Sequence, residues 1–276
     1  MKSYREIAGD GGSDVLGQVA ERSARLHARM VPIANRLAVM SGKGGVGKST
    51  VTANLAAALA MRGRRVAVLD ADLNGPCLAR MLGVEGQRLK LGDDGIVPAA
   101  GALGVKVVSM DLLLPETGSA LAWQAPAARN QFAWRGTLEA SALVEFAGDT
   151  AWGALDFLLI DLPPGADRFA DLQDLLPACD KALVVTIPSG VAALSVRRSV
   201  ILARRLEARL LGAVENMAGL FGEETPAQAL GVPVLGRIPF DPRIAQCADR
   251  GVPFVGAHPD TPAARAFSAI ADEVER

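Results

Sequence analysis

A glycine-rich segment near the start of the chain has the spacing of a phosphate-binding loop. Residues 41–50 read SGKGGVGKST, and positions 42–49 match the pattern G-x-x-x-x-G-K-[ST]. Glycines allow the backbone to turn several N–H groups toward an anion, and the N-terminus of a following helix adds partial positive charge. The segment therefore predicts a nucleotide-binding loop. The residues expected to line it are Gly42, Gly44, Gly45, Val46, Gly47, Lys48, Ser49 and Thr50.

Two side chains of this loop are suited to a magnesium-bound triphosphate. Lys48 can reach the β- and γ-phosphates, where its charge would contribute to catalysis. The hydroxyl of Ser49 is suited to Mg²⁺. The loop holds a second cation, Lys43, for which the general pattern gives no role.

Carboxylates follow two apolar runs of the sequence. RVAVLDADLNGP ends one run in Asp70 and Asp72, and DFLLIDLPPG ends another in Asp161. We expect Asp161 and Asp70 to hold Mg²⁺, and Asp72 to orient an attacking water. Acids at strand ends also form caps and turns, which is the alternative interpretation. Gly165, which follows two prolines, is expected to offer its backbone N–H to the γ-phosphate.

The elements that must position these residues alternate between short apolar runs and helical stretches. A helix is predicted over residues 50–62, with Gly63 as its stop. Nearly continuous apolar strands separated by helices indicate a doubly wound α/β fold, a mostly parallel sheet with helices on both faces. Ligands of such sheets bind at the carboxyl ends of the strands. The strands are predicted over residues 37–40, 66–69, 105–108, 157–160, 183–187, 211–214 and 234–238.

Several segments together carry a resemblance to a known family. GKGGVGKST, with lysine in its second position, is similar to the deviant Walker A motif of the MinD/ParA/Mrp class of P-loop ATPases. Within that class, DADLNGP, LLLPE, FAWRG, DFLLIDLPPG, GAVENM and GRIPFDPRI resemble, in this order, the Mrp/ApbC-type ATPases of iron–sulfur cluster assembly. The resemblance covers residues 35–258.

The resemblance implies a homodimer in which each Lys43 reaches the phosphates bound by the other subunit. A cation supplied in trans would tie hydrolysis to dimer closure, as an arginine finger does. The resemblance also implies that Asn216 contacts the adenine ring and that Pro239 and Asp241 form the loop beside the base. Each of these three is alternatively an ordinary turn residue. No N-K-x-D guanine motif is present, so ATP is favoured over GTP.

The chain departs from the family where a cargo would bind. Mrp-type carriers place a C-x-x-C pair after ENM, whereas this chain reads ENMAGLFGEETPAQALG. Thiolates are the usual ligands of iron–sulfur clusters. Cys77, Cys179 and Cys247 lie far apart, so a cluster is possible but the cysteine spacing does not support it. The segment 117–131, before FAWRG, has no assigned role, with a surface insertion and a partner-binding loop as the alternatives.

Composition narrows the cellular setting. The chain has 276 residues, with 29 Lys and Arg against 30 Asp and Glu, so its net charge gives no reason to expect a nucleic acid as partner. No run reaches the roughly 18 apolar residues of a membrane span, and an odd number of scattered cysteines favours the reducing cytoplasm. Residues 1–34 are expected to be a flexible segment and a lead-in helix, and residues 35–276 a single ATPase domain.

Two functional hypotheses follow. The first is an Mg²⁺-dependent, ATP-hydrolysing homodimer that serves iron–sulfur cluster or metallocofactor assembly together with a client protein. The second is a switch of the ParA/MinD type that positions or remodels a partner. A switch acting on membranes or DNA needs an exposed basic helix. We expect the basic stretch VRRSVILARRLEAR to be a solvated helix face, and the C-terminal stretch TPAARAFSAIADEVER to pack on the domain.

Overall fold

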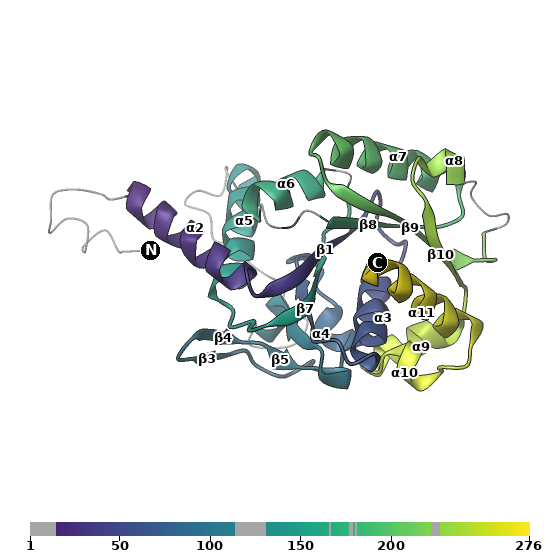
Figure 1. Ribbon diagram of the computed structural model, residues 1–276, viewed down its shortest axis with the longest axis horizontal. Helices are drawn as coiled ribbons and strands as arrows, with labels where there is room; N and C mark the ends of the chain where they lie inside the picture. Colours follow the sequence, from purple (N-terminus) through teal and green to yellow (C-terminus); the bar gives the residue numbers. More distant parts are fainter. Residues whose placement is uncertain (1–14, 114–130, 166, 177–178, 180, 222–226) are drawn as a thin grey trace, which may run out of the picture.

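A computed structural model describes residues 15–113, 131–165, 167–176, 179, 181–221 and 227–276. The polar N-terminus and most of the segment 117–131 lie outside these described residues. Figure 1 shows a central sheet with helices on both of its faces. This arrangement is the predicted doubly wound α/β fold.

The sheet has eight strands in the order β10-β9-β8-β1-β7-β2-β6-β5. Every neighbouring pair is parallel except β5 and β6, which are antiparallel at one edge. The strands are β1 (Ile33–Ser41), β2 (Val66–Asp70), β5 (Ala99–Ala100), β6 (Lys106–Val108), β7 (Leu155–Asp161), β8 (Lys181–Thr186), β9 (Arg209–Ala218) and β10 (Val234–Pro239). The seven predicted strands are all present, with ends that differ by a few residues.

Strand β1 shows how the sequence fills both sides of the sheet. Successive side chains of a strand point to opposite faces. Leu37 and Val39 therefore enter one hydrophobic core, and Ala38 and Met40 enter the other. Both cores are buried, which explains why the strands read as continuous apolar runs.

The helices divide between the two faces of the sheet (Figure 1). The Leu37 face is covered by α3 (Lys48–Met61), α4 (Leu78–Met81), α9 (Pro242–Asp249), α10 (Phe254–Ala257) and α11 (Pro262–Glu275). The Met40 face is covered by α2 (Val15–Met30), α5 (Gln131–Asp149), α6 (Arg168–Leu175), α7 (Gly190–Arg205) and α8 (Ala227–Leu230). The remaining short elements are β3 (Lys90–Gly92), β4 (Gly95–Val97), η1 (Ala102–Gly104) and η2 (Met110–Leu112).

Helix α3 is the element that joins the phosphate loop to the core. Its small side chains, mostly Ala, Thr and Val with two leucines, are buried on almost every side, so the helix can lie close against the sheet. It ends as predicted at Gly63, whose φ of 77° closes the last turn through the bond from Arg64 N to Leu59 O. The site is therefore anchored in the centre of the molecule.

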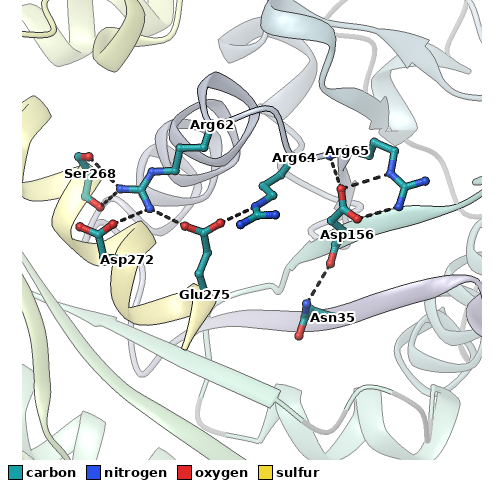
Figure 2. A network of polar contacts seen from close by, with 8 residues as sticks. All are labelled: Asn35, Arg62, Arg64, Arg65, Asp156, Ser268, Asp272 and Glu275. Atoms are coloured by element: carbon teal, nitrogen blue, oxygen red, sulfur yellow. Dashed lines mark hydrogen bonds and ion pairs between the residues drawn. The ribbon is translucent and has the colours of Figure 1, made fainter.

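A polar network fixes the opposite end of α3 (Figure 2). Arg62 contacts Asp272 and Glu275 of α11 at 2.8 and 2.6 Å, and Arg64 contacts the same Glu275 at 2.6 Å. Arg65 pairs with Asp156 of β7 at 2.7 Å. These contacts hold the C-terminal helix on the domain, where Phe267 and Ile270 of α11 are fully buried, as predicted.

Candidate nucleotide-binding site

The phosphate loop lies between β1 and α3, at the carboxyl edge of the parallel strands. Gly45 and Gly47 have φ values of 79° and 80°, a left-handed conformation that favours glycine. Gly47 is also the N-cap of α3, and a Cβ placed on it would lie 2.3 Å from Nδ2 of Asn216. The sequence therefore supplies glycine where both backbone conformation and neighbouring atoms require it.

The carboxylate of Asp161, at the end of β7, is the common hydrogen-bond partner of three side chains from α3. Nζ of Lys48 donates to Oδ2 of Asp161 at 2.5 Å, and Oγ of Ser49 donates to the same oxygen at 2.5 Å. Oγ1 of Thr52 donates to Oδ1 at 2.6 Å. Asp161 is completely buried, and a buried carboxylate is stable only with such partners. Cation, hydroxyl and acid meet here as the sequence predicts.

Thr52 is a member of this cluster that the sequence analysis did not single out. It lies one helical turn after Lys48, so both side chains are on the same face of α3. The four-residue spacing from Lys48 is the feature of the sequence that could have identified Thr52. Its hydroxyl also donates to the carbonyl of Lys48 at 3.1 Å.

Asp70 ends β2 directly beside Asp161, its register partner on β7. Its Oδ2 accepts bonds from the backbone N–H groups of Cys77 and Leu78 at 3.0 and 3.1 Å, and from Oγ of Ser109 at 3.3 Å. Its Oδ1 is buried and has no hydrogen-bond partner within the described part of the chain. Burial, and then repulsion by Asp161, raise the pKa of Asp70 to about 7.

The donor set fits Mg²⁺. The hydroxyl of Ser49 and the carboxylates of Asp70 and Asp161 are oxygen donors, which Mg²⁺ prefers. The unpartnered Oδ1 of Asp70 is the kind of buried atom that a cation would satisfy. Mg²⁺ usually takes one or two carboxylates plus water and phosphate oxygens, so a complete cage of protein ligands is not required.

Asp72 and Gly165 lie on the two loops that leave these strands. The side chain of Asp72 is half-buried and makes no hydrogen bond or ion pair with any residue of the described ranges. The N–H of Gly165, in contrast, donates to the carbonyl of Ser41 at 3.1 Å. That bond ties the loop after β7 to the end of β1, and it must exchange before the predicted phosphate contact can form.

Lys43 is half-buried, and its side chain makes no hydrogen bond or ion pair with a described residue. The residue before it, Gly42, is contacted by α7, because Oγ of Ser195 donates to the carbonyl of Gly42 at 2.7 Å. Ser195 was missed in the sequence, since 153 positions separate the two residues and no local pattern joins them.

The residues assigned to the base lie on or just after the adjacent strands β9 and β10. Asn216, at the end of β9, reaches the loop, where its Nδ2 donates to the carbonyl of Val46 at 2.9 Å. Asp241 accepts from the N–H of Arg243 at 3.0 Å and caps α9, and its hydrogen bonds to the Arg243 side chain hold the pKa of Asp241 below its ordinary value. Pro239 ends β10. Contacts of all three with adenine stay predictions.

The cysteines do not gather into a ligand group. Cys77 is half-buried, Cys179 and Cys247 are buried, and all three are free thiols. Across the described ranges, no cluster of three or more His, Cys, Asp or Glu side chains could hold a metal ion. None of the helices found there is both long enough and apolar enough to cross a membrane.

The fold and the site define a P-loop nucleotide hydrolase: a glycine loop before a helix, its lysine, and an acid at the end of a neighbouring parallel strand. A sequence model of the ParA family, described as NUBPL iron-transfer P-loop NTPase, matches residues 32–275. The chain belongs to this family and is a P-loop ATPase. The resemblance seen in the sequence is thereby confirmed.

Relatives and solved structures agree with this assignment. The chain is 41% identical to an iron-sulfur cluster carrier protein of Saccharolobus solfataricus, over 93% of this chain and 88% of the relative. It is 37% identical to the bovine cytosolic Fe-S cluster assembly factor NUBP2, over 86% and 90%. An Archaeoglobus fulgidus nucleotide-binding protein in complex with ADP superposes with a TM-score of 0.67 at 34% identity, covering 83% of this chain and 90% of that one. A Pyrococcus horikoshii MinD complexed with Mg-ADP gives 0.65 at 26% identity, over 88% and 96%.

Proposed function

We propose that the chain binds Mg·ATP at the loop of residues 42–49 and hydrolyses it as a homodimer that serves iron–sulfur cluster or metallocofactor assembly. The observation that carries the proposal is the buried contact of Lys48, Ser49 and Asp161 at the carboxyl edge of the sheet. Relatives named as iron-sulfur cluster carriers supply the biological setting. The bovine relative, named as cytosolic, and the free thiols favour the cytoplasm.

The residues of the site divide the work of hydrolysis. Mg²⁺, when bound, neutralises charge on the phosphate oxygens. Ser49, Asp70 and Asp161 would hold it, directly or through water, and Lys48 would leave Asp161 for the phosphates. Asp72, whose side chain makes no hydrogen bond or ion pair with a described residue, would orient the attacking water.

A homodimer is supported by apolar side chains at the same edge of the sheet. These side chains follow strands β8, β9 and β10, whose carboxyl ends lie at the same edge of the sheet as the phosphate loop. Exposed apolar side chains gathered in one region are typical of protein interfaces. They are Val191, Leu194, Leu220, Phe221 and Phe240, exposed by 70%, 60%, 46%, 51% and 48%.

The cysteines of the chain do not by themselves offer a site for an iron–sulfur cluster. A bridged cluster needs thiolates close together, and the three cysteines are scattered. Anaerobic reconstitution with iron and sulfide, read by absorbance and iron per dimer, tests this: a stable cluster on the protein alone supports carriage, and none favours a role in remodelling a client.

A ParA/MinD-type positioning switch is the second candidate. MinD structures share the fold, including one from Pyrococcus furiosus at 28% identity and a TM-score of 0.65. Its support is weaker, because relatives at about 40% identity are named as cluster carriers. The exposed arginines of α7 alternate with buried apolar positions, which is typical of a solvated helix face.

The decisive experiment on the mechanism compares the two loop lysines. Lys43→Ala should keep ATP affinity within about threefold while lowering kcat by at least about a hundredfold, because a cation supplied in trans acts on the charge that develops during hydrolysis. Turnover by Lys43→Ala at the wild-type rate, independent of protein concentration, would contradict the role across the dimer. Lys48→Ala is the matched variant, and it should lose turnover at every protein concentration, whether or not the dimer forms.

A further inference from the structure

The first residue of the phosphate loop is held by a side chain from a distant helix. Oγ of Ser195, in the second turn of α7, donates to the carbonyl of Gly42 at 2.7 Å. A Cβ on Gly42 would lie 2.3 Å from that Oγ and 2.6 Å from the Cβ of Ser195. The close approach therefore requires glycine at position 42, and the hydrogen bond is part of how α7 packs on the loop.

This bond acts on the peptide that leads into Lys43. The carbonyl of Gly42 and the N–H of Lys43 belong to one planar trans peptide, so fixing the oxygen fixes the direction of the N–H. It also sets the direction in which the Cα of Lys43 leaves the loop. Within the described part of the chain, no other side chain makes a hydrogen bond to this peptide, and the Lys43 side chain makes no hydrogen bond or ion pair.

We infer that Ser195 is a positioning residue for hydrolysis, which orients the Gly42–Lys43 peptide and through it the charge of Lys43. The inference rests on the proposed role of Lys43. Ser195 itself is not expected to touch the nucleotide, because its hydroxyl already donates its hydrogen bond to the carbonyl of Gly42.

The other end of the loop is held differently. Nδ2 of Asn216 donates to the carbonyl of Val46 at 2.9 Å, so α7 and β9 each fix one end of the loop. Asn216 is also predicted to contact the base, and its replacement would therefore change affinity and geometry together. Ser195 has no predicted contact with the base, so its effect on Lys43 can be measured separately from an effect on nucleotide affinity.

The test is a double-mutant cycle between Ser195→Ala and Lys43→Ala, with kcat for ATP and the Kd of ADP measured for each variant. Ser195→Ala should lower kcat about tenfold, the effect of one hydrogen bond of ordinary strength, and leave the Kd within about threefold. In the Lys43→Ala background the same change should alter kcat by less than about twofold, because the group through which it acts is already gone. Ser195→Thr keeps the hydroxyl and should restore turnover.

Ser199→Ala is the matched control, since Ser199 lies one turn further along α7 and, among the described residues, its hydroxyl bonds only within the helix, to the carbonyl of Ser195 at 3.3 Å. It should keep wild-type kcat. An unchanged kcat for Ser195→Ala, or the same fold loss in both backgrounds, overturns the inference while the role of Lys43 stands. Normal turnover by Lys43→Ala overturns the role of Lys43, and the inference with it.

Discussion

At the scale of single residues, the site is organised by the need to stabilise one buried carboxylate. Asp161 is fully buried and is bonded by a cation on one oxygen and a threonine hydroxyl on the other. An ionised acid in such surroundings is costly without partners. The groups that would hold Mg·ATP therefore also stabilise the folded site.

Replacement of Lys48 should separate these two roles. Lys48→Ala leaves the carboxylate of Asp161 without its cation, so we expect a loss of about 3–5 kcal/mol in the free energy of unfolding together with loss of turnover. Adding Asp161→Asn should recover much of that stability, because an amide needs no counter-ion, and should leave turnover absent. Urea unfolding and phosphate release measure the two quantities. A double variant as unstable as the single one would count against this account.

The hydroxyl of Thr52 gives a second prediction at this scale. Thr52→Val keeps the shape of the side chain but removes the 2.6 Å bond to Oδ1 of Asp161, so unfolding should be easier by about 1–3 kcal/mol. Loss of this orienting contact should also raise the Mg²⁺ concentration for half-maximal hydrolysis about tenfold or more.

The control is Thr150→Val, which removes another fully buried threonine hydroxyl, one that donates to the carbonyl of Phe146 at 2.5 Å. It should lower stability and leave the Mg²⁺ dependence unchanged. If both variants shift the Mg²⁺ dependence equally, Thr52 has no specific part in the site.

Sequence patterns predicted the residues that belong to motifs, but they did not predict the contacts that join distant parts of the chain to the phosphate loop. Lys48, Ser49 and Asp161 belong to motifs and meet as expected. The hydrogen bonds from Ser195 to Gly42 and from Asn216 to Val46 join positions that are 153 and 170 residues apart. Such contacts depend on how α7 and β9 pack, which no window of the sequence contains.

At the scale of elements, long apolar segments were predictable and short ones were not. All seven predicted strands and the helix after the phosphate loop form, because each is a buried run bounded by glycine or polar residues. The hairpin of β3 and β4 has three residues in each strand, largely exposed, and strand β5 has only two. Such pieces are stabilised by their neighbours rather than by a pattern of their own.

An ion pair between Arg65 and Asp156 joins the start of β2 to the start of β7, and the ionisation of the Asp156 carboxylate can be followed as the pH changes. Hydrogen bonds from the side chain and backbone of Arg65 hold the pKa of Asp156 at about 2, against an ordinary value of 3.8 (Figure 2). Because the folded-state pKa is depressed, the ionised form stabilises the protein above the unfolded pKa, and this stability is lost as the pH falls through the folded value. The window is therefore about pH 4 to 2.

The prediction is that wild type and Asp156→Asn differ in free energy of unfolding at pH 6 and converge as the pH falls toward 2. Denaturant unfolding across this range measures the difference. Asp260→Asn is the control, since the Asp260 side chain makes no hydrogen bond or ion pair with a described residue, and it should stay near wild type throughout. A difference that does not change with pH would assign the effect of Asp156 to packing instead.

At the scale of the whole molecule, the parallel sheet explains why so many functional groups share one edge. The seven strands from β10 to β6 in the order of the sheet run in the same direction, so the loops after them lie at the same edge as the phosphate loop. This placement could be predicted from the alternation of strands and helices. The cargo could not, because the cysteines that would mark its site in a carrier are absent from the expected place in the chain.

The same convergence leads to a prediction about self-association. Leu194 and Ile201 are apolar residues of α7 exposed by 60% and 53%, and Leu194 lies next to Ser195 at the loop, whereas Ile201 is about two turns away. If a second copy docks over the loop, Leu194→Glu should place a charge in that interface and Ile201→Glu should not. Both positions are exposed in the single chain, so neither variant should unfold it.

We therefore expect Leu194→Glu to weaken ATP-dependent dimerisation at least about tenfold in analytical ultracentrifugation, by the cost of burying an unpaired charge. Its turnover per subunit should be low at micromolar protein and should rise toward wild type at higher concentration, because mass action restores the dimer. Ile201→Glu should follow the wild-type curve. Equal dependence of turnover on protein concentration for the two variants would show that the interface does not lie over the phosphate loop. A turnover per subunit that is constant with concentration would show that hydrolysis does not need the dimer.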